Sequence, residues 1–203
     1  YAYLILFTST IKSSPELIMR FKKFSATFNS GRNYAEAQSV VNEVCELILQ
    51  NKEESIGIVA MNSQQRDEIE NQLELKLSEN SLLQSLYDKK MKSFEPIFIK
   101  NLENVQGDER DVIVISMTYG PSQIAGKVFQ RFGPINQSSG WRRLNVLFTR
   151  SKKRMHIISS MNSTDILTSD TSSKGVSALK EFLRYCETGF LHEEKQTGKA
   201  PDS

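Results

Sequence analysis

Two arginines in the second half of the chain have the spacing of a phosphate-binding pair. Residues 142–151 are predicted to form a helix, one side of which is apolar. Arg143 and Arg150 are seven residues apart, so this helix would place them on one face, about two turns apart. Two guanidinium groups on a helix with a buried back suit bidentate binding of phosphate. Arg143 and Arg150 are therefore candidate contacts to a phosphoryl group.

A cluster of carboxylates precedes the most strand-like segment. Asp108, Glu109 and Asp111 come just before residues 112–117, of which five are apolar. Paired carboxylates can hold Mg²⁺, so a metal-dependent nuclease is one function to weigh. Such an enzyme usually needs a further acid on the strand that follows, but residues 112–164 contain no Asp or Glu. A nuclease is the less favoured alternative, and no metal ligand is assigned.

Two familiar catalytic motifs are incomplete. The segment from Gly120 to Lys127 is similar to a Walker A phosphate loop, but five residues separate its glycines where the pattern has four. Val128 follows the lysine, so no hydroxyl is placed for Mg²⁺. The Gly-x-Ser-x-Gly segment of many hydrolases is missing, and His156 lies in a presumed core strand. Neither a complete ATP site nor a hydrolase triad is expected in this chain.

The positive charge of the chain is concentrated in one segment. The net charge is +2, yet residues 112–164 carry eight basic residues and no acid: Lys127, Arg131, Arg142, Arg143, Arg150, Lys152, Lys153 and Arg154. The other residues carry 18 basic and 24 acidic groups. With no acid nearby in sequence to pair with them, these basic residues predict a polyanionic partner, either nucleotide phosphates or a nucleic-acid backbone.

Length and composition favour one α/β domain. The chain has 203 residues, 38% hydrophobic and 25% charged, which excludes collagen-like, coiled-coil and wholly disordered chains. No apolar run approaches the ~18 residues of a membrane span. Cys45 and Cys186 lack the spacing of a metal site or a disulfide framework, so a cytoplasmic, intracellular protein is expected. The chain begins with Tyr1 rather than methionine, so a fragment of a longer chain is expected.

Short apolar runs alternate with helix-like segments. Strands are predicted at 3–8, 56–61, 96–99, 112–117 and 155–160. Helices are predicted at 15–23, 35–50, 63–77, 142–151 and 176–185. Loops or irregular structure are predicted at 25–33, 78–95, 118–140 and 159–174. This alternation predicts a parallel sheet covered on both faces, with ligands at the carboxyl ends of its strands, after Met61, Ile99 and Met117.

Three segments resemble motifs of superfamily 1 helicases. Residues 105–116 (VQGDERDVIVIS) are similar to motif V, residues 142–150 (RRLNVLFTR) to motif VI, and residues 56–65 (IGIVAMNSQQ) to motif IV. Their order and spacing also agree with the family. The resemblance covers roughly residues 35–187. It is closest to the branch that includes the RNA-surveillance helicases and large bacterial helicase–nuclease fusions, and the loop 132–140 resembles the bacterial members.

The resemblance implies the second motor domain of a helicase, a RecA-like three-layer α/β domain whose mainly parallel sheet is covered by helices on both faces. In the family, ATP with Mg²⁺ lies between two such domains, and the first domain supplies Walker A and the Mg²⁺-binding acids. Arg150 would be the arginine finger and Arg143 a supporting contact. Gln106, Gly107 and Glu109 would meet the nucleotide. Asn62, Asn104 and Val105 would face single-stranded nucleic acid, with DNA favoured over RNA.

The resemblance also sets domain boundaries and leaves alternatives. Residues 1–33 are expected to be a poorly defined N-terminal segment, 34–188 the motor domain and 189–203 a disordered tail. Ser151 stands where the family often has Ala, and the aromatic-Arg element before motif IV is not visible. The first motor domain is absent, so the fragment alone is predicted not to hydrolyse ATP at a helicase rate. A RecA-like module that only binds nucleic acid is the main alternative.

Overall fold

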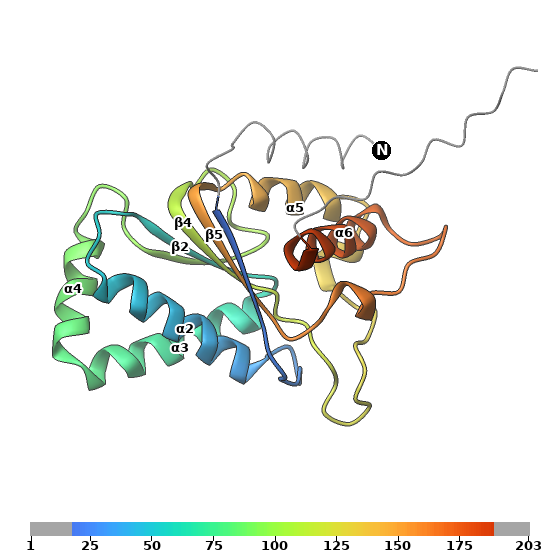
Figure 1. Ribbon diagram of the computed structural model, residues 1–203, viewed down its shortest axis with the longest axis horizontal. Helices are drawn as coiled ribbons and strands as arrows, with labels where there is room; N and C mark the ends of the chain where they lie inside the picture. Colours follow the sequence, from blue (N-terminus) through green and yellow to red (C-terminus); the bar gives the residue numbers. More distant parts are fainter. Residues whose placement is uncertain (1–17, 189–203) are drawn as a thin grey trace, which may run out of the picture.

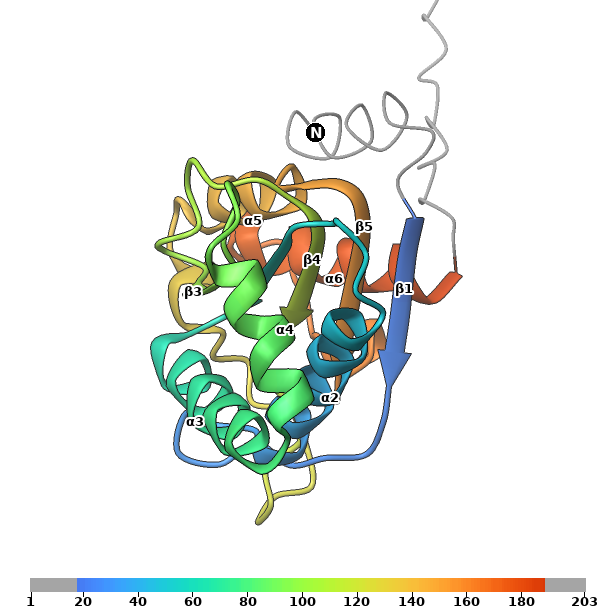
Figure 2. The same ribbon diagram turned by 90° about the vertical axis from the view of Figure 1, so that its left-hand side faces the viewer.

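The strands of this chain form one parallel sheet. The computed structural model describes residues 18–188, in which five strands are hydrogen-bonded in the order β1-β5-β4-β2-β3. Their bounds are Ile18–Lys23 (β1), Ile56–Ala60 (β2), Phe98–Asn101 (β3), Arg110–Ser116 (β4) and Ser151–Ser159 (β5). Every pairing is parallel. All five carboxyl ends therefore lie at one edge, toward which the arrows of β1 and β4 point in Figure 2.

Helices cover both faces of the sheet (Figure 1). One face is covered by α2 (Tyr34–Leu49), α3 (Ser63–Glu79) and α4 (Ser81–Met91). The other is covered by α5 (Gly140–Phe148) and α6 (Lys174–Thr188). The predicted three-layer α/β architecture is confirmed. None of the described helices is long and apolar enough to cross a membrane.

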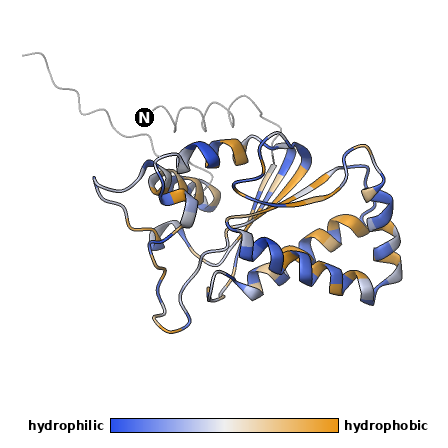
Figure 3. Cartoon of the chain, turned by 180° about the vertical axis from the view of Figure 1, so that it is seen from behind, coloured by the Kyte–Doolittle hydropathy of each residue, from blue (hydrophilic) through white to orange (hydrophobic). Residues whose placement is uncertain are grey.

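Alternate residues of the central strands point to opposite layers, because side chains alternate along a strand. Val112 and Val114 of β4 belong to the apolar cluster under α2 and α3, whereas Ile113 and Ile115 belong to the cluster under α5 and α6. The central strands are apolar over much of their length in Figure 3, and they are polar where β4 and β5 begin. Burial on both faces explains why these strands appear in the sequence as continuous apolar runs.

Asparagines begin three of the helices. The side-chain oxygens of Asn33, Asn62 and Asn80 accept backbone N–H groups three residues later, at 3.2, 2.8 and 3.0 Å respectively. These bonds satisfy donors that the first turn of a helix leaves unpaired. The start of α3 after Asn62 confirms the prediction. The prediction that residues 78–95 are irregular is wrong, because α4 occupies Ser81–Met91. Only Leu83 of α4 is buried, so no apolar stripe marks this helix in the sequence.

The first described element is a strand, not the predicted helix at 15–23. β1 pairs with β5, with Met19 opposite Met155. Pairing with a strand more than a hundred residues away leaves no local signal in the sequence. The sheet therefore begins before residue 34, the expected start of the domain. The predicted strand at 3–8 and the tail from 189 onward lie outside the described residues.

The fifth strand begins at Ser151, four residues earlier than predicted, and carries the basic residues 152–154. The loop from 118 to 140 is confirmed, with one short 3₁₀ helix, Gly133–Asn136. A second 3₁₀ helix, Ser163–Asp165, interrupts the loop before α6. α5 and α6 pack against each other through the stacked rings of Phe148 and Phe182, whose centroids are 3.8 Å apart.

Candidate functional site

The segments before β4 and β5 meet at the amino edge of the sheet. Glu109 directly precedes β4, and Arg150 directly precedes β5. The backbone N–H of Arg110 donates to the carbonyl of Arg150 at 3.0 Å. Oε1 of Glu109 lies 3.6 Å from Nη1 of Arg150. The structure thus brings the motif V and motif VI residues together.

This edge is the opposite of the one predicted to bind ligands. The segments after Met61, Ile99 and Met117 do lie at the carboxyl edge, as predicted. However, the chain that leaves β3 must return to the amino edge before β4 can begin, because the two strands are in one parallel sheet. Glu109 and Arg150 therefore lie at the edge opposite to the one where this fold class is expected to bind ligands.

Arg150 is held against its own domain. Its Nε donates to the carbonyl of Val146 and its Nη2 to Oγ1 of Thr149, both at 2.9 Å. The carbonyl of Val146 belongs to the last turn of α5, where a cation is favourable. With Glu109 on the third nitrogen, the whole guanidinium group is engaged. Its side chain is only 17% exposed, and a phosphoryl group that bound it would compete with Glu109.

Arg143 and Arg150 do not lie on one helix. α5 ends at Phe148, so Arg150 lies in the turn that follows and the predicted helical face does not form. Arg143 instead donates from Nη1 to the carbonyl of Pro134 (3.2 Å) and to Oε1 of Gln137 (2.7 Å). Its Nη2 lies 3.6 Å from Oε1 of Glu103. Arg143 therefore links α5 to the segment that carries motif V.

The predicted nucleotide-facing segment is exposed. Gln106, Gly107 and Glu109 all face solvent. Gly107 has φ of +89°, in the left-handed region that favours glycine, and no atom lies within 4 Å of the position that a Cβ would take. The backbone at Gly107 is therefore open to close approach by a ligand.

Arg110 is a buried residue that the sequence analysis did not single out. Its Nε and Nη2 donate to the carbonyl of Pro96 (3.1 and 2.9 Å), and its Nη1 donates to the carbonyl of Glu109 (2.7 Å). The guanidinium carbon lies 4.8 Å from the ring centroid of Phe98. Arg110 thus fixes the backbone that carries Glu109. Its place between two acids in the sequence gives no sign of this role.

The three carboxylates of the nuclease alternative bind three different cations. Asp108 pairs with Lys100, and Asp111 pairs with Lys153 at 3.2 Å. Glu109 pairs with Arg150, as described above. Within residues 18–188 no group of three or more His, Cys, Asp or Glu side chains is placed to hold a metal ion. The geometry gives the nuclease alternative no support.

The residues expected to face a single strand differ in what they can contact. Asn104 is exposed. Asn62 is half-buried and caps α3, and its Nδ2 donates to the carbonyl of Gly31 at 3.0 Å. Val105 is 1% exposed and belongs to the core under α5 and α6. Only the backbone at Val105 could therefore meet a ligand.

Comparison with known proteins places the chain in a family. A family model described as an AAA domain matches residues 6–162. The chain belongs to this family. Two relatives of this AAA domain are named as uncharacterized ATP-dependent helicases: MG140 of Mycoplasma genitalium, 31% identical over 186 residues, and its homolog in Mycoplasma pneumoniae, 30% identical over 187 residues. The resemblance to the second motor domain of superfamily 1 helicases is confirmed.

The AAA domain is a small part of these relatives. Each alignment covers 90% of this chain and 16% of the relative. A solved structure, the C-terminal domain of a possible DNA helicase from Lactobacillus plantarum, is 10% identical with a TM-score of 0.43, over 89% of this chain and 92% of that one.

A buried carboxyl group organises the carboxyl edge of the AAA domain. Glu36 is fully buried. One of its oxygens accepts the hydroxyl of Ser116 at 2.7 Å and the backbone N–H of Thr118, and the other accepts the backbone N–H of Ser160 at 3.2 Å. Burial raises the pKa of Glu36 from 4.5 to about 7, although these hydrogen bonds oppose the increase.

The same network extends to α3. The side chain of Gln65 accepts the backbone N–H of Asn33 at 2.7 Å and donates to Oγ of Ser116 at 3.2 Å. Glu36 therefore ties the first turn of α2 to the segments that follow β4 and β5, and Gln65 ties the first turn of α3 to Asn33 and the end of β4. Gln65 ends the segment that resembles motif IV, but the burial of Gln65 and Glu36 leaves no signal in the sequence, because a polar residue in the first turn of a helix normally faces solvent.

The basic segment is largely neutralised by acids from elsewhere in the chain. Arg143 and Arg150 pair with the glutamates described above, and Lys152, Lys153 and Arg154 pair with Glu95, Asp111 and Glu54. The lack of acids nearby in the sequence therefore does not leave these residues unpaired in the fold. Lys127, Arg131 and Arg142 form no ion pair with any described acid. Of the eight basic residues in the segment, these three are therefore the ones whose charge is free to meet a polyanion.

His156 is confirmed as a core residue. It is 3% exposed, and its Nδ1 lies 2.7 Å from Oε1 of Glu43. Burial lowers the pKa of His156, and the contact with Glu43 opposes that change.

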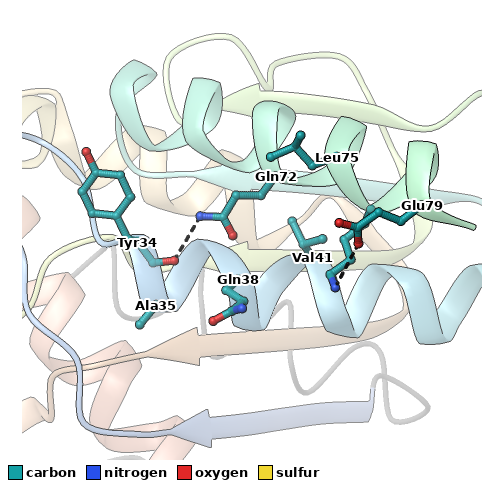
Figure 4. A pocket seen from close by; sticks show the side chains of 8 residues that line it. Tyr34, Ala35, Gln38, Val41, Gln72, Leu75 and Glu79 are labelled. Carbon is teal, nitrogen blue, oxygen red and sulfur yellow. Dashed lines mark hydrogen bonds and ion pairs between the residues drawn. The ribbon is translucent and has the colours of Figure 1, made fainter.

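A separate hollow of about 470 Å³ lies between α2 and α3, beside Gln38 and Gln72 (Figure 4). None of the predicted site residues lines it.

Proposed function

We propose that this AAA domain works in a longer protein that couples ATP hydrolysis to movement on single-stranded nucleic acid. The observation that carries the proposal is the meeting of Arg150 with the exposed motif V segment at one edge of the sheet. A guanidinium group beside an open, glycine-containing backbone suits a phosphorylated ligand. ATP with Mg²⁺ would bind between this edge and a first motor domain of the same parent chain.

In this proposal each residue of the amino edge has one task. Arg150 leaves Glu109 and stabilises the negative charge that develops on the terminal phosphoryl group during its transfer. Gln106, Gly107 and Glu109 contact the nucleotide. Arg143 acts indirectly, because its contacts hold α5 in place. ATP supplies the phosphoryl group, and residues of the first motor domain supply the Walker A loop and the Mg²⁺-binding acids.

The strand would follow the carboxyl edge of the sheet. The exposed side chain of Asn104, the backbone beside it and the segment around Asn62 are the proposed contacts. Contacts to the strand backbone tolerate any sequence. The domain would act inside the cell, which agrees with its free cysteines, Cys45 and Cys186. We expect the bound strand to be DNA, and the experiment below compares DNA with RNA.

The test is ATP hydrolysis by the full-length parent protein with and without single-stranded DNA or RNA. We expect either strand, and DNA more strongly, to raise the rate severalfold. Strand binding without hydrolysis would refute the motor and favour the alternative, a module that only binds nucleic acid. Hydrolysis at the same rate with and without a strand would refute movement along one.

Glu109 offers a separate prediction about nucleotide binding. Replacing Glu109 with alanine in the parent protein should raise KM for ATP about threefold to tenfold, because the nucleotide loses a contact. The value of kcat should not fall, because the variant also frees Arg150 from its ion pair. Steady-state kinetics at saturating strand measure both constants. Glu103→Ala is the matched control, since Glu103 is also half-exposed and also 3.6 Å from an arginine. Equal KM values for the two variants would show that Glu109 does not contact the nucleotide.

A further inference from the structure

A hollow with aromatic walls lies at the carboxyl end of β4. Its volume is about 460 Å³ and it is lined by Phe28, Tyr119, Gly120, Phe129, Gln130 and Arg131. Pockets that bind small organic groups start at about 300 Å³. Its walls come from two segments far apart in sequence: the one that follows β1 and the long loop that follows β4, drawn in yellow in Figure 1.

The inner wall of the hollow is rigid. Tyr119 is 5% exposed, and its ring lies 5.5 Å from the ring of Phe28 and 5.4 Å from that of Phe132. The residue before it, Thr118, has φ of +69° and donates its N–H to buried Glu36. The backbone N–H of Phe28 donates to the carbonyl of Pro121 at 2.9 Å. The hollow is therefore preformed rather than dependent on a ligand.

Phe129 is exposed although both of its neighbours are anchored. Val128 is buried. The side chain of Gln130 donates to the carbonyl of Asp165 at 3.0 Å and accepts the N–H of Leu167 at 2.8 Å. The ring of Phe129 is nevertheless 53% exposed, so the core does not require it. An exposed ring on a fixed backbone provides a flat surface for stacking.

The charge around the hollow favours an anionic ligand. Arg131 lines it, Lys127 lies on the same loop, and neither pairs with a described acid. No acidic residue lines the hollow. The position also fits a strand: Oγ1 of Thr118 accepts the backbone N–H of Met61 at 3.1 Å, which joins this loop to the segment that contains Asn62.

We propose that this hollow binds one base of the single-stranded nucleic acid, stacked on Phe129, with Arg131 contacting the adjacent phosphate. This proposal rests on the proposed function, because it extends the strand contacts from Asn104 and Asn62 to the end of β4. Stacking on an aromatic ring binds any base, because every base has a π-face. The ligand class is thus a single-stranded oligonucleotide of any sequence.

The experiment uses the full-length parent protein and a short single-stranded DNA that carries 2-aminopurine, a base whose fluorescence falls on stacking. Phe129→Ala should weaken binding about tenfold and abolish the fluorescence decrease, and Phe129→Trp should restore both. Phe94→Ala is the matched control, because Phe94 is a fully exposed phenylalanine in a loop outside the hollow and should leave binding unchanged. Thermal unfolding of each variant checks its fold.

Arg131 gives an independent measurement. Arg131→Gln should reduce the salt dependence of binding by about one phosphate contact. If Phe129→Ala binds the strand as Phe94→Ala does, the base site is refuted, even when wild-type ATP hydrolysis remains strand-stimulated and the proposed function stands. If the wild-type protein binds no strand, the proposed function fails and the base site fails with it.

Discussion

Replacing Arg150 with alanine should lower strand-stimulated kcat of the parent protein by about 10³- to 10⁵-fold, the range found when a phosphoryl-transfer enzyme loses its arginine finger. The reason is that a guanidinium group aimed at the transferred phosphoryl group stabilises charge that exists mainly in the transition state. Binding of the strand and of ATP should change much less. Single-turnover hydrolysis with saturating strand measures the effect directly.

Two further variants make the result specific to Arg150. Arg142→Ala removes an exposed arginine that pairs with no described acid, so kcat should stay within about twofold of wild type, as for an ordinary surface change. Arg150→Lys keeps the charge but loses the bidentate geometry, so its kcat should fall between those of wild type and alanine. A loss smaller than tenfold in Arg150→Ala, with hydrolysis still stimulated by the strand, would show that Arg150 is not the finger.

The sequence identified the residues of the amino edge but not their arrangement. Motifs V and VI single out Glu109 and Arg150 by residue type and order, and these two side chains do meet. Which edge of the sheet they occupy depends on strand register, and Arg110 faces Ser151 only in the folded sheet. Helical spacing therefore predicts one helical face for Arg143 and Arg150, whereas α5 ends before Arg150 is reached.

The fold was predictable where the signal is local. α3 has an asparagine cap and buried Ile69, Leu73 and Leu77 at helical spacing, so its type and start followed from the sequence. The edge strand β1 could not be found, because its pairing with β5 is distant along the chain. Glu36 could not be found either, since its burial depends on three segments that converge only after folding.

That buried carboxyl group makes the stability of the domain depend on pH. The folded chain keeps a proton on Glu36 up to about pH 7, whereas an unfolded chain loses it near pH 4.5. Between these values the folded state binds more protons, so the free energy of unfolding falls as pH rises. The pKa difference corresponds to a contribution of about 3 kcal/mol to the free energy of unfolding. This contribution is present in full below pH 4.5 and lost above pH 7. Urea unfolding of the 203-residue chain across this interval measures it.

The variant Glu36→Gln isolates the contribution of this carboxyl group, because an amide cannot ionise. The difference in unfolding free energy between wild type and Glu36→Gln should move by about 3 kcal/mol in favour of the variant as pH rises from 4.5 to 7. His156 acts in the opposite sense: burial lowers its pKa, so its contribution is lost as pH falls below 6.5. That contribution is common to both proteins and cancels in the difference.

Glu46→Gln, an exposed glutamate on the same helix, is the control and should follow the wild-type profile within about 0.5 kcal/mol. A difference between wild type and Glu36→Gln that stays constant over the interval would mean that Glu36 ionises alike in the folded and unfolded chains. The Glu36 network would then hold the segments after β4 and β5 through a charged carboxylate, whose buried charge its hydrogen-bond donors compensate in full.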